Sequence, residues 1–240
     1  EARFVPSMKL EDNIKKIKKY DNQIKSFGDK SLLNKVFYVI HFPKRREKKG
    51  NLINNKARDY KTRKHLKKVT HNIVKMRKLK NNISNRVRGI DACSSEIGTR
   101  PEVYGNAFRV LKNHRIAFKN SLINKNKIKK LYATYHVGED FLDLTSGLRA
   151  IDEAIDFLNL GRGDRLGHAI ALGINVREYY EYKYNRAILP KQDLLDNIAW
   201  ILGKCVENGF ELDLNLKWEL KNKYYELVKE IYLKEYNSYD

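Results

Sequence analysis

Cysteine is scarce in this sequence, which has only Cys93 and Cys205 among its 240 residues. The two lie far apart in the chain and form no C-x-x-C motif, so their spacing supports neither a disulfide framework nor a cysteine-based zinc site. It also excludes zinc sites that are built on H-x-E followed by P-C-x-x-C. The sequence contains no internal repeat and no glycine-rich phosphate loop, so repeat proteins and phosphate-loop proteins are not indicated.

Long apolar runs are also missing. No stretch approaches the roughly 20 residues of a membrane-spanning helix, and residues 1–6 (EARFVP) do not resemble a signal peptide. The composition, with 42% hydrophobic and 32% charged residues, is typical of a globular protein. We therefore expect a cytoplasmic protein without a membrane partner. Because the sequence does not begin with Met, we also expect a fragment or a processed piece.

Acidic residues are few in the first third of the chain. Residues 1–88 hold 27 Lys and Arg against 7 Asp and Glu, whereas the remaining residues hold 22 of each. Such asymmetry is typical of proteins that contact polyanions, nucleic acid among them. The alternative is an AT-rich genome, which would enrich Lys, Asn, Ile and Tyr without any functional meaning. Both readings stay open at the level of the sequence.

The hydrophobic periodicity predicts strands that alternate with helices, followed by further helices. The expected strands are 36–42, 87–93, 131–136 and 166–169, and the expected helices are 8–26, 57–83, 101–113, 145–160, 176–184, 194–208 and 216–236. This order indicates an α/β protein with a parallel sheet or part of a (β/α) barrel. The expected regions are a basic helical one with one strand (1–88), a core (89–171) and a helical extension (172–240).

Three candidate catalytic residues follow two strands of the core. The runs 131–136 and 164–168 each end in a histidine, and a helix-like segment separates them at the spacing of a βαβ unit. His136, Glu139 and His168 should therefore lie on adjacent carboxyl strand ends, where parallel α/β proteins place their active sites. An imidazole can bind zinc, a nearby carboxylate can move a proton, and a second imidazole can orient water. The alternative is two structural histidines and an ordinary exposed loop acid.

For other polar residues near the expected strand ends we expect no catalytic role. We expect a structural or substrate-contact role for His41, and a structural role for the carboxylate of Asp91. Residues 44–55 (KRREKKGNLINN) read as a mobile polar loop whose charges would attract phosphate groups.

Three sequence motifs resemble those of a known enzyme family. Residues 136–139 (HVGE) are similar to the H-[AV]-G-E motif of the adenosine deaminases, and residues 165–168 (RLGH) are similar to their R-[IVL]-G-H motif. Residues 89–96 (GIDACSSE) are similar to their G-x-D-L-A-G-x-E strand. The motifs occur in the family's order, and the resemblance covers about residues 89–171. The sequence of residues 136–155 most resembles that of the large bacterial phage-defence deaminases of the RADAR type.

The resemblance implies a partial (β/α)8 TIM-type barrel with extra helices, in which the four expected strands would be the third to sixth of eight. It implies zinc-dependent hydrolytic deamination of adenosine or adenine nucleotides, ATP among them, to the inosine form. His136 would be a zinc ligand, His168 would hold or deprotonate the attacking water, and Glu139, protonated through burial, would protonate N1 of the purine. Ser94, where the family has glycine, and Gly138 would contact the substrate. The narrower resemblance implies a homo-oligomer, an ATPase partner and a role in antiviral defence.

The family's other zinc ligands have no match in this sequence. The family binds zinc with an H-x-H pair from its first strand, one His from its fifth and an Asp from its eighth, and only His136 matches this set. We therefore expect the middle of a longer enzyme or one piece of a split one, which by itself binds zinc weakly and is inactive. The missing barrel segments would come from the same or another chain. The alternative is a catalytically silent barrel fragment with a basic nucleic-acid-binding region.

Overall fold

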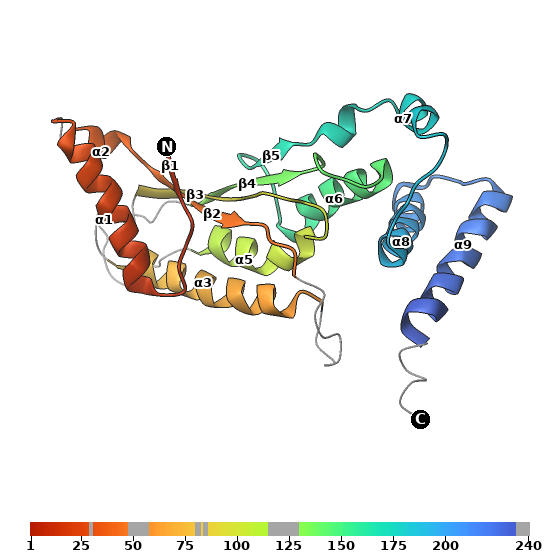
Figure 1. Ribbon diagram of the computed structural model, residues 1–240, viewed down its shortest axis with the longest axis horizontal. Helices are drawn as coiled ribbons and strands as arrows, with labels where there is room; N and C mark the ends of the chain where they lie inside the picture. Colours follow the sequence, from red (N-terminus) through yellow and green to blue (C-terminus); the bar gives the residue numbers. More distant parts are fainter. Residues whose placement is uncertain (29–30, 48–57, 80–82, 84–85, 115–129, 234–240) are drawn as a thin grey trace. The chain divides into compact units, whose positions relative to one another are not determined.

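The computed structural model of the protein describes residues 1–28, 31–47, 58–79, 83, 86–114 and 130–233 (Figure 1). The chain divides into two compact units. Unit 1 comprises residues 1–140 and 150–169, and unit 2 comprises residues 141–149 and 170–240. Among the described residues, no helix is both long enough and apolar enough to cross a bilayer.

Unit 1 is built on a five-stranded sheet in which every neighbouring pair is parallel. The strands lie in sequence order, namely β1 (Ala2–Phe4), β2 (Tyr38–Pro43), β3 (Val87–Cys93), β4 (Tyr132–Val137) and β5 (Arg165–His168). Right-handed crossovers between parallel strands in this order place the connecting helices on one face of the sheet. The expected α/β class is confirmed, whereas the described strands form an open sheet and not a closed barrel.

The long helices of unit 1 each bury apolar residues. The helices of this unit are α1 (Leu10–Ser26), α2 (Leu32–Lys35), α3 (Tyr60–Lys78), α5 (Pro101–Asn113) and α6 (Leu144–Phe157), the last of which is divided between the two units. Figure 1 shows α3 and α5 running together along the sheet. The apolar stripe of α3 is buried and consists of Leu66, Val69, Ile73 and Met76. Burial of this stripe fixes the helix against the core and leaves its lysines on the outside.

Several predicted bounds are corrected by the structure. β1 was not predicted, because three residues are too few to show a periodicity. The strand expected at 36–42 is β2 at Tyr38–Pro43, and the one expected at 166–169 ends at His168. His168 and Ala169 have φ angles of 64° and 51°, which break the extended backbone. Part of the helix expected at 57–83 lies outside the described residues.

Unit 2 consists of helices. A short 3-10 helix (Ile170–Gly173) precedes α7 (Val176–Tyr182), α8 (Lys191–Asn208), α9 (Leu214–Val228) and a π-helical turn (Lys229–Leu233). As predicted, α8 ends at Gly209, whose left-handed backbone (φ 67°) suits glycine. α8 begins three residues earlier than predicted, directly after Pro190. The core of this unit joins α8 to α9 through Leu195, Ile198 and Leu227.

A buried ion pair attaches α1 to the sheet of unit 1. Arg86 donates two hydrogen bonds of 2.6 Å to the Asp21 carboxylate, which also accepts one from the Tyr38 hydroxyl. Burial would raise the pKa of Asp21, but the hydrogen bonds from Arg86 and Tyr38 outweigh it and the pKa lies below its usual value. The Asp21 carboxylate is therefore charged in the folded protein.

We expect Asp21→Asn to lower the free energy of unfolding at pH 7 by about 2–4 kcal/mol, because it removes the negative charge that the mostly buried Arg86 guanidinium contacts. The folded pKa of Asp21 is depressed, so its stabilisation is present above the unfolded value of about 4 and is lost as the pH falls through the folded pKa. Denaturant unfolding at pH 7 and at pH 3 measures both effects. Glu11→Gln on the same helix is the control, and an equal loss at both pH values would contradict this account.

Candidate active site

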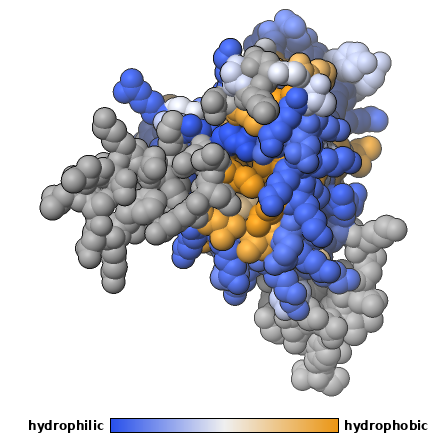
Figure 2. All heavy atoms as spheres, turned by 90° about the vertical axis from the view of Figure 1, so that its left-hand side faces the viewer, coloured by the Kyte–Doolittle hydropathy of each residue, from blue (hydrophilic) through white to orange (hydrophobic). Residues whose placement is uncertain are grey.

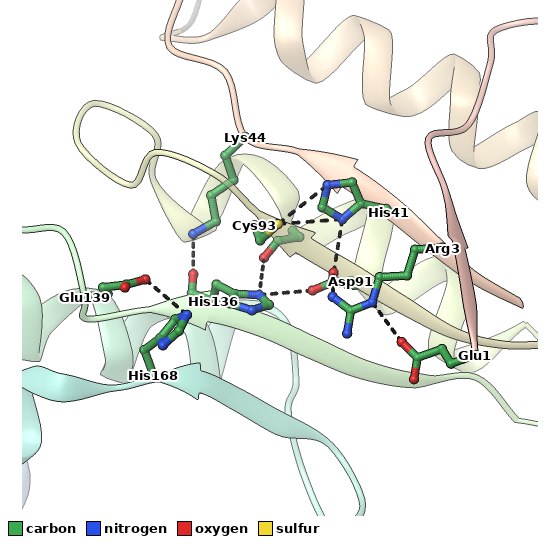
Figure 3. A network of polar contacts seen from close by, with 10 residues as sticks. Glu1, Arg3, His41, Lys44, Asp91, Cys93, His136, Glu139 and His168 are labelled. Carbon is green, nitrogen blue, oxygen red and sulfur yellow. Dashed lines mark hydrogen bonds and ion pairs between the residues drawn. The ribbon is translucent and has the colours of Figure 1, made fainter.

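Strand register brings the predicted catalytic residues to one edge of the sheet. His41 lies opposite Asp91 in the β2–β3 pair, and Val137 lies opposite His168 in the β4–β5 pair. Because all five strands are parallel, their carboxyl ends meet at the same edge. Figure 3 shows side chains from all five strands there, with the contact between Glu139 and His168 separate from the network around Asp91.

Asp91 is the centre of this network. Its side chain is 0% exposed, and its Oδ2 atom accepts a 2.8 Å bond from Arg3 Nη1 and lies 3.0 Å from His41 Nδ1. Its Oδ1 atom lies 3.1 Å from Nδ1 of His136 but has no hydrogen-bond partner. Burial would raise the pKa of Asp91, but the hydrogen bond to His41 and the positive charges nearby hold the pKa below its usual value. The centre of the site is therefore an ionised, deeply buried carboxylate.

His136 is held between β3 and β5. Its Nδ1 atom lies 3.3 Å from the carbonyl oxygen of Ala92 as well as near Asp91. Its ring covers Gly167, where an added Cβ would come within 2.5 Å of Cδ2 of the imidazole. The glycine of the RLGH motif thus leaves the room that the His136 ring occupies.

Glu139 and His168 form a second, more exposed pair. Glu139 Oε2 lies 3.2 Å from His168 Nε2, and the rings of His136 and His168 have centroids 5.2 Å apart. The side chains of Glu139 and His168 are 43% and 46% exposed. The structure thus contradicts the expected burial of Glu139, because this residue follows the strand end and projects from the sheet edge.

Glu96 is a carboxylate of this region whose pKa is raised. It accepts a 2.7 Å hydrogen bond from the backbone N–H of Gly138, and burial raises its pKa despite the opposing effect of Lys44. Gly138 has a φ of +76°, and an added Cβ would meet Ile151 Cδ1 at 2.5 Å. Backbone conformation and packing thus require glycine at position 138. This requirement is independent of the substrate contact expected for Gly138. Ser94 is exposed and has a φ of +92°, a conformation that glycine adopts more readily.

Lys44 is not the exposed loop cation that the sequence predicted. It is 2% exposed, donates a hydrogen bond to the carbonyl oxygen of His136, and lies 4.5 Å from the centre of the Tyr135 ring. Burial lowers the pKa of Lys44 to about 8, although the negative charge of Glu96 opposes this shift. Lys44 thus contacts two residues of β4, while residues 48–55 of the expected loop lie outside the described residues.

Cys93 and His41 were not expected to act together. Cys93 Sγ lies 3.6 Å from Nε2 and 3.8 Å from Nδ1 of His41, and ligand atoms of His41, Asp91 and Cys93 all lie within 4.8 Å of one another. Burial raises the pKa of the Cys93 thiol, and the charge of Asp91 adds to this effect. The ligand atoms are thus close enough for one metal ion, an arrangement that was not part of the structural or substrate-contact role expected of His41. Only the register of β2 against β3, which local periodicity does not encode, brings these residues together.

Comparison with known proteins assigns no family to the chain. No protein-family model matches the sequence, and no curated protein matches it. The likeness to adenosine deaminases rests on the three motifs. It is a hypothesis that can be tested against the geometry of the site.

We expect Gly167→Ala to displace the His136 ring and to destabilise unit 1 by roughly 1–3 kcal/mol, the usual range for overpacking. Denaturant unfolding measures the stability, and the NMR shifts of the histidine rings report the displacement. Gly161→Ala is the matched control, since nothing lies within 4 Å of the added Cβ there. Unchanged histidine shifts in the Gly167 variant would contradict the packing role of this glycine.

Proposed function

We propose that this protein takes part in the zinc-dependent hydrolytic deamination of adenosine or an adenine nucleotide, ATP among them, to the inosine form. The observation that carries the proposal is the short distance between Glu139 and His168, 3.2 Å, beside the ring of His136. A carboxylate and an imidazole in contact at the carboxyl edge of a parallel sheet can share and move protons. The family motifs give these same three residues acid–base and metal-binding roles.

The addition of water to C6 needs two proton transfers, and the chain offers one group for each. Glu139 would donate a proton to N1 of the purine, which makes C6 electrophilic. His168 would orient the attacking water, accept one of its protons as the oxygen adds to C6, and pass that proton to the amino group, which leaves as ammonia. The remaining hydroxyl proton on C6 would return to Glu139, so that the net change is water in and ammonia out. The exposure of both side chains leaves them accessible to a nucleobase that enters from solvent.

Zinc fits the residues that surround His136. Asp91 Oδ1 is buried without a hydrogen-bond donor, and it faces the imidazole of His136 at 3.1 Å. A buried carboxylate oxygen without a donor is costly unless a cation or another donor satisfies it. We propose that His136 holds zinc at this edge. Zinc bound there would supply a Lewis acid that makes water nucleophilic at neutral pH.

The order of the strands supports a place for this sheet in a (β/α)8 barrel. A sequential parallel sheet with its helices on one face has the winding that a barrel requires. With β1 included, the five strands would be the second to sixth of eight. We propose that the remaining segments come from elsewhere in the same protein or from another chain, with a homo-oligomer and an ATPase partner as in RADAR-type systems.

We expect Glu139→Gln to reduce kcat of the intact protein by at least about 100-fold, because the amide keeps the shape of the side chain but cannot donate the proton. His168→Ala should have an effect of similar size. The measurement is the absorbance change when adenosine or ATP is converted to its inosine form in the presence of zinc.

Asp140→Asn, next to Glu139, is the matched control and should stay within a few-fold of wild type. Zinc content should be nearly unchanged in Glu139→Gln. If zinc-loaded wild-type protein converts neither adenosine nor ATP, or if Glu139→Gln remains within a few-fold of wild type, the proposal is wrong.

A second candidate function is nucleic-acid binding through the basic first third of the chain. On α1, an open surface hollow is lined by Lys15, Lys18 and Lys19 together with Asn22, Gln23 and Ser26. Figure 2 shows hydrophilic side chains over much of the face at this end of the molecule, with a hydrophobic area among them. Clustered lysines on one face are the electrostatic feature that phosphate backbones recognise.

Reversal of the charges at Lys15, Lys18 and Lys19 should weaken binding of a single-stranded oligonucleotide. Each lost phosphate contact should also reduce the slope of log affinity against log salt by about 0.7, the value for single strands. Fluorescence anisotropy at several salt concentrations measures both. Lys217→Glu combined with Lys221→Glu is the control in α9. Equal binding by the α1 variant and wild type would rule out this face as the nucleic-acid site.

A further inference from the structure

We propose that His41, Asp91 and Cys93 form a binding site for one transition-metal ion of the zinc class, next to His136. The three residues come from two adjacent strands, β2 and β3, and their ligand atoms lie within 4.8 Å of one another. This site goes beyond the proposed deaminase chemistry, for which the motifs supply His136 as the only zinc ligand. It concerns metal binding and holds whether or not the protein deaminates adenosine.

The types of ligand indicate which ion would bind. The cluster offers an imidazole nitrogen, a carboxylate oxygen and a cysteine sulfur. Zinc and cobalt accept all three ligand types, whereas magnesium and calcium prefer oxygen ligands alone. A sulfur ligand therefore selects a softer ion and makes a hard cation an unsuitable occupant.

The distances between the ligand atoms suit a single ion. With bonds of about 2.3 Å to sulfur and about 2.0 Å to nitrogen, tetrahedral geometry requires nitrogen and sulfur to be about 3.5 Å apart. The observed distances from Cys93 Sγ to the two ring nitrogens of His41 are 3.6 and 3.8 Å. His41 Nδ1 is also 3.0 Å from Asp91 Oδ2, so one imidazole lies next to both other ligands.

One carboxylate oxygen of Asp91 accepts no hydrogen bond, and a bound cation would provide a contact for it. The carboxylate is completely buried, yet its Oδ1 atom accepts no hydrogen bond. His136 Nδ1 lies 3.1 Å from this oxygen, so a bound ion would have a fourth potential ligand within reach. Three protein ligands with a fourth position left for another group is the arrangement of catalytic zinc sites.

The competing explanation is a purely structural charge network. Arg3 already donates a 2.8 Å hydrogen bond to Asp91 Oδ2, and it balances part of the carboxylate's charge. The Arg3 side chain is 45% exposed, however, and it comes from the three-residue edge strand β1. It can move into solvent at little cost when a metal ion approaches the carboxylate. The network around Asp91 thus does not exclude an ion.

Cobalt(II) titration of the purified protein tests the site, because a thiolate bound to cobalt gives a charge-transfer absorption band in the near ultraviolet. We expect wild type to develop this band to saturation at one cobalt per chain, and zinc but not magnesium to abolish it. Cys93→Ser should lose the band. Cys205→Ser, which removes the other cysteine, should keep it.

The histidine ligand is tested by affinity. Loss of an outer-shell partner alone typically weakens metal binding about 10–100-fold, so His41→Ala should weaken zinc binding at least tenfold in competition with a chromophoric chelator. His71→Ala, an exposed position on α3, should leave the affinity unchanged. Circular dichroism verifies that each variant is folded. If His41→Ala does not fold, the comparison of Cys93→Ser with Cys205→Ser decides the question.

Two results would overturn the proposal. One is the absence of a thiolate band in wild-type protein at saturating cobalt, and the other is a band that persists in Cys93→Ser. Cobalt binding without any deamination of adenosine would uphold this site and count only against the proposed function.

Discussion

The buried carboxylate of Asp91 is the group on which the arrangement of the sheet edge depends. A charged carboxylate without contact to water is costly unless positive or hydrogen-bonding partners surround it. Arg3, His41 and His136 provide these partners, and they come from β1, β2 and β4, respectively. The central strand β3 is therefore linked to three others through one side chain, in addition to the backbone ladder. The imidazole positions at this edge follow from the need to satisfy that charge.

Two carboxylates at the same edge have environments that differ strongly. Glu96 is enclosed and accepts a backbone hydrogen bond from Gly138, whereas Glu139 is 43% exposed and contacts only His168 among the interactions described. The buried side chain of Lys44 contacts the ring of Tyr135 on β4. The edge thus combines an inner layer of fixed charges, which sets the geometry, with an outer pair that solvent and ligands can reach. This division separates the groups that shape the site from those that would act on a substrate.

The sequence predicted the positions of Glu139 and of the two strand-end histidines better than the buried contacts around Asp91. His136, Glu139 and His168 could be placed because two parallel strands each end in a histidine, and parallel strands share an edge. The contact between His41 and Cys93 could not be predicted, because it depends on the register of β2 against β3 across 52 residues of chain. β1 escaped prediction since three residues carry no periodicity. The bounds of the helix at 101–113 were predicted correctly, because its apolar stripe and Pro101 at its start are local signals.

The bond between Arg3 and Asp91 has a consequence for the stability of the edge strand. β1 has only three residues, and the ion pair between Arg3 and Asp91 adds to the three backbone pairs that attach it to β2. Anything that takes up the charge of Asp91 must weaken the attachment of β1. By thermodynamic reciprocity, whatever fastens β1 in place must lower the affinity of Asp91 for a cation by the same factor. The attachment of β1 to the sheet and the binding of a cation at Asp91 are thus coupled equilibria.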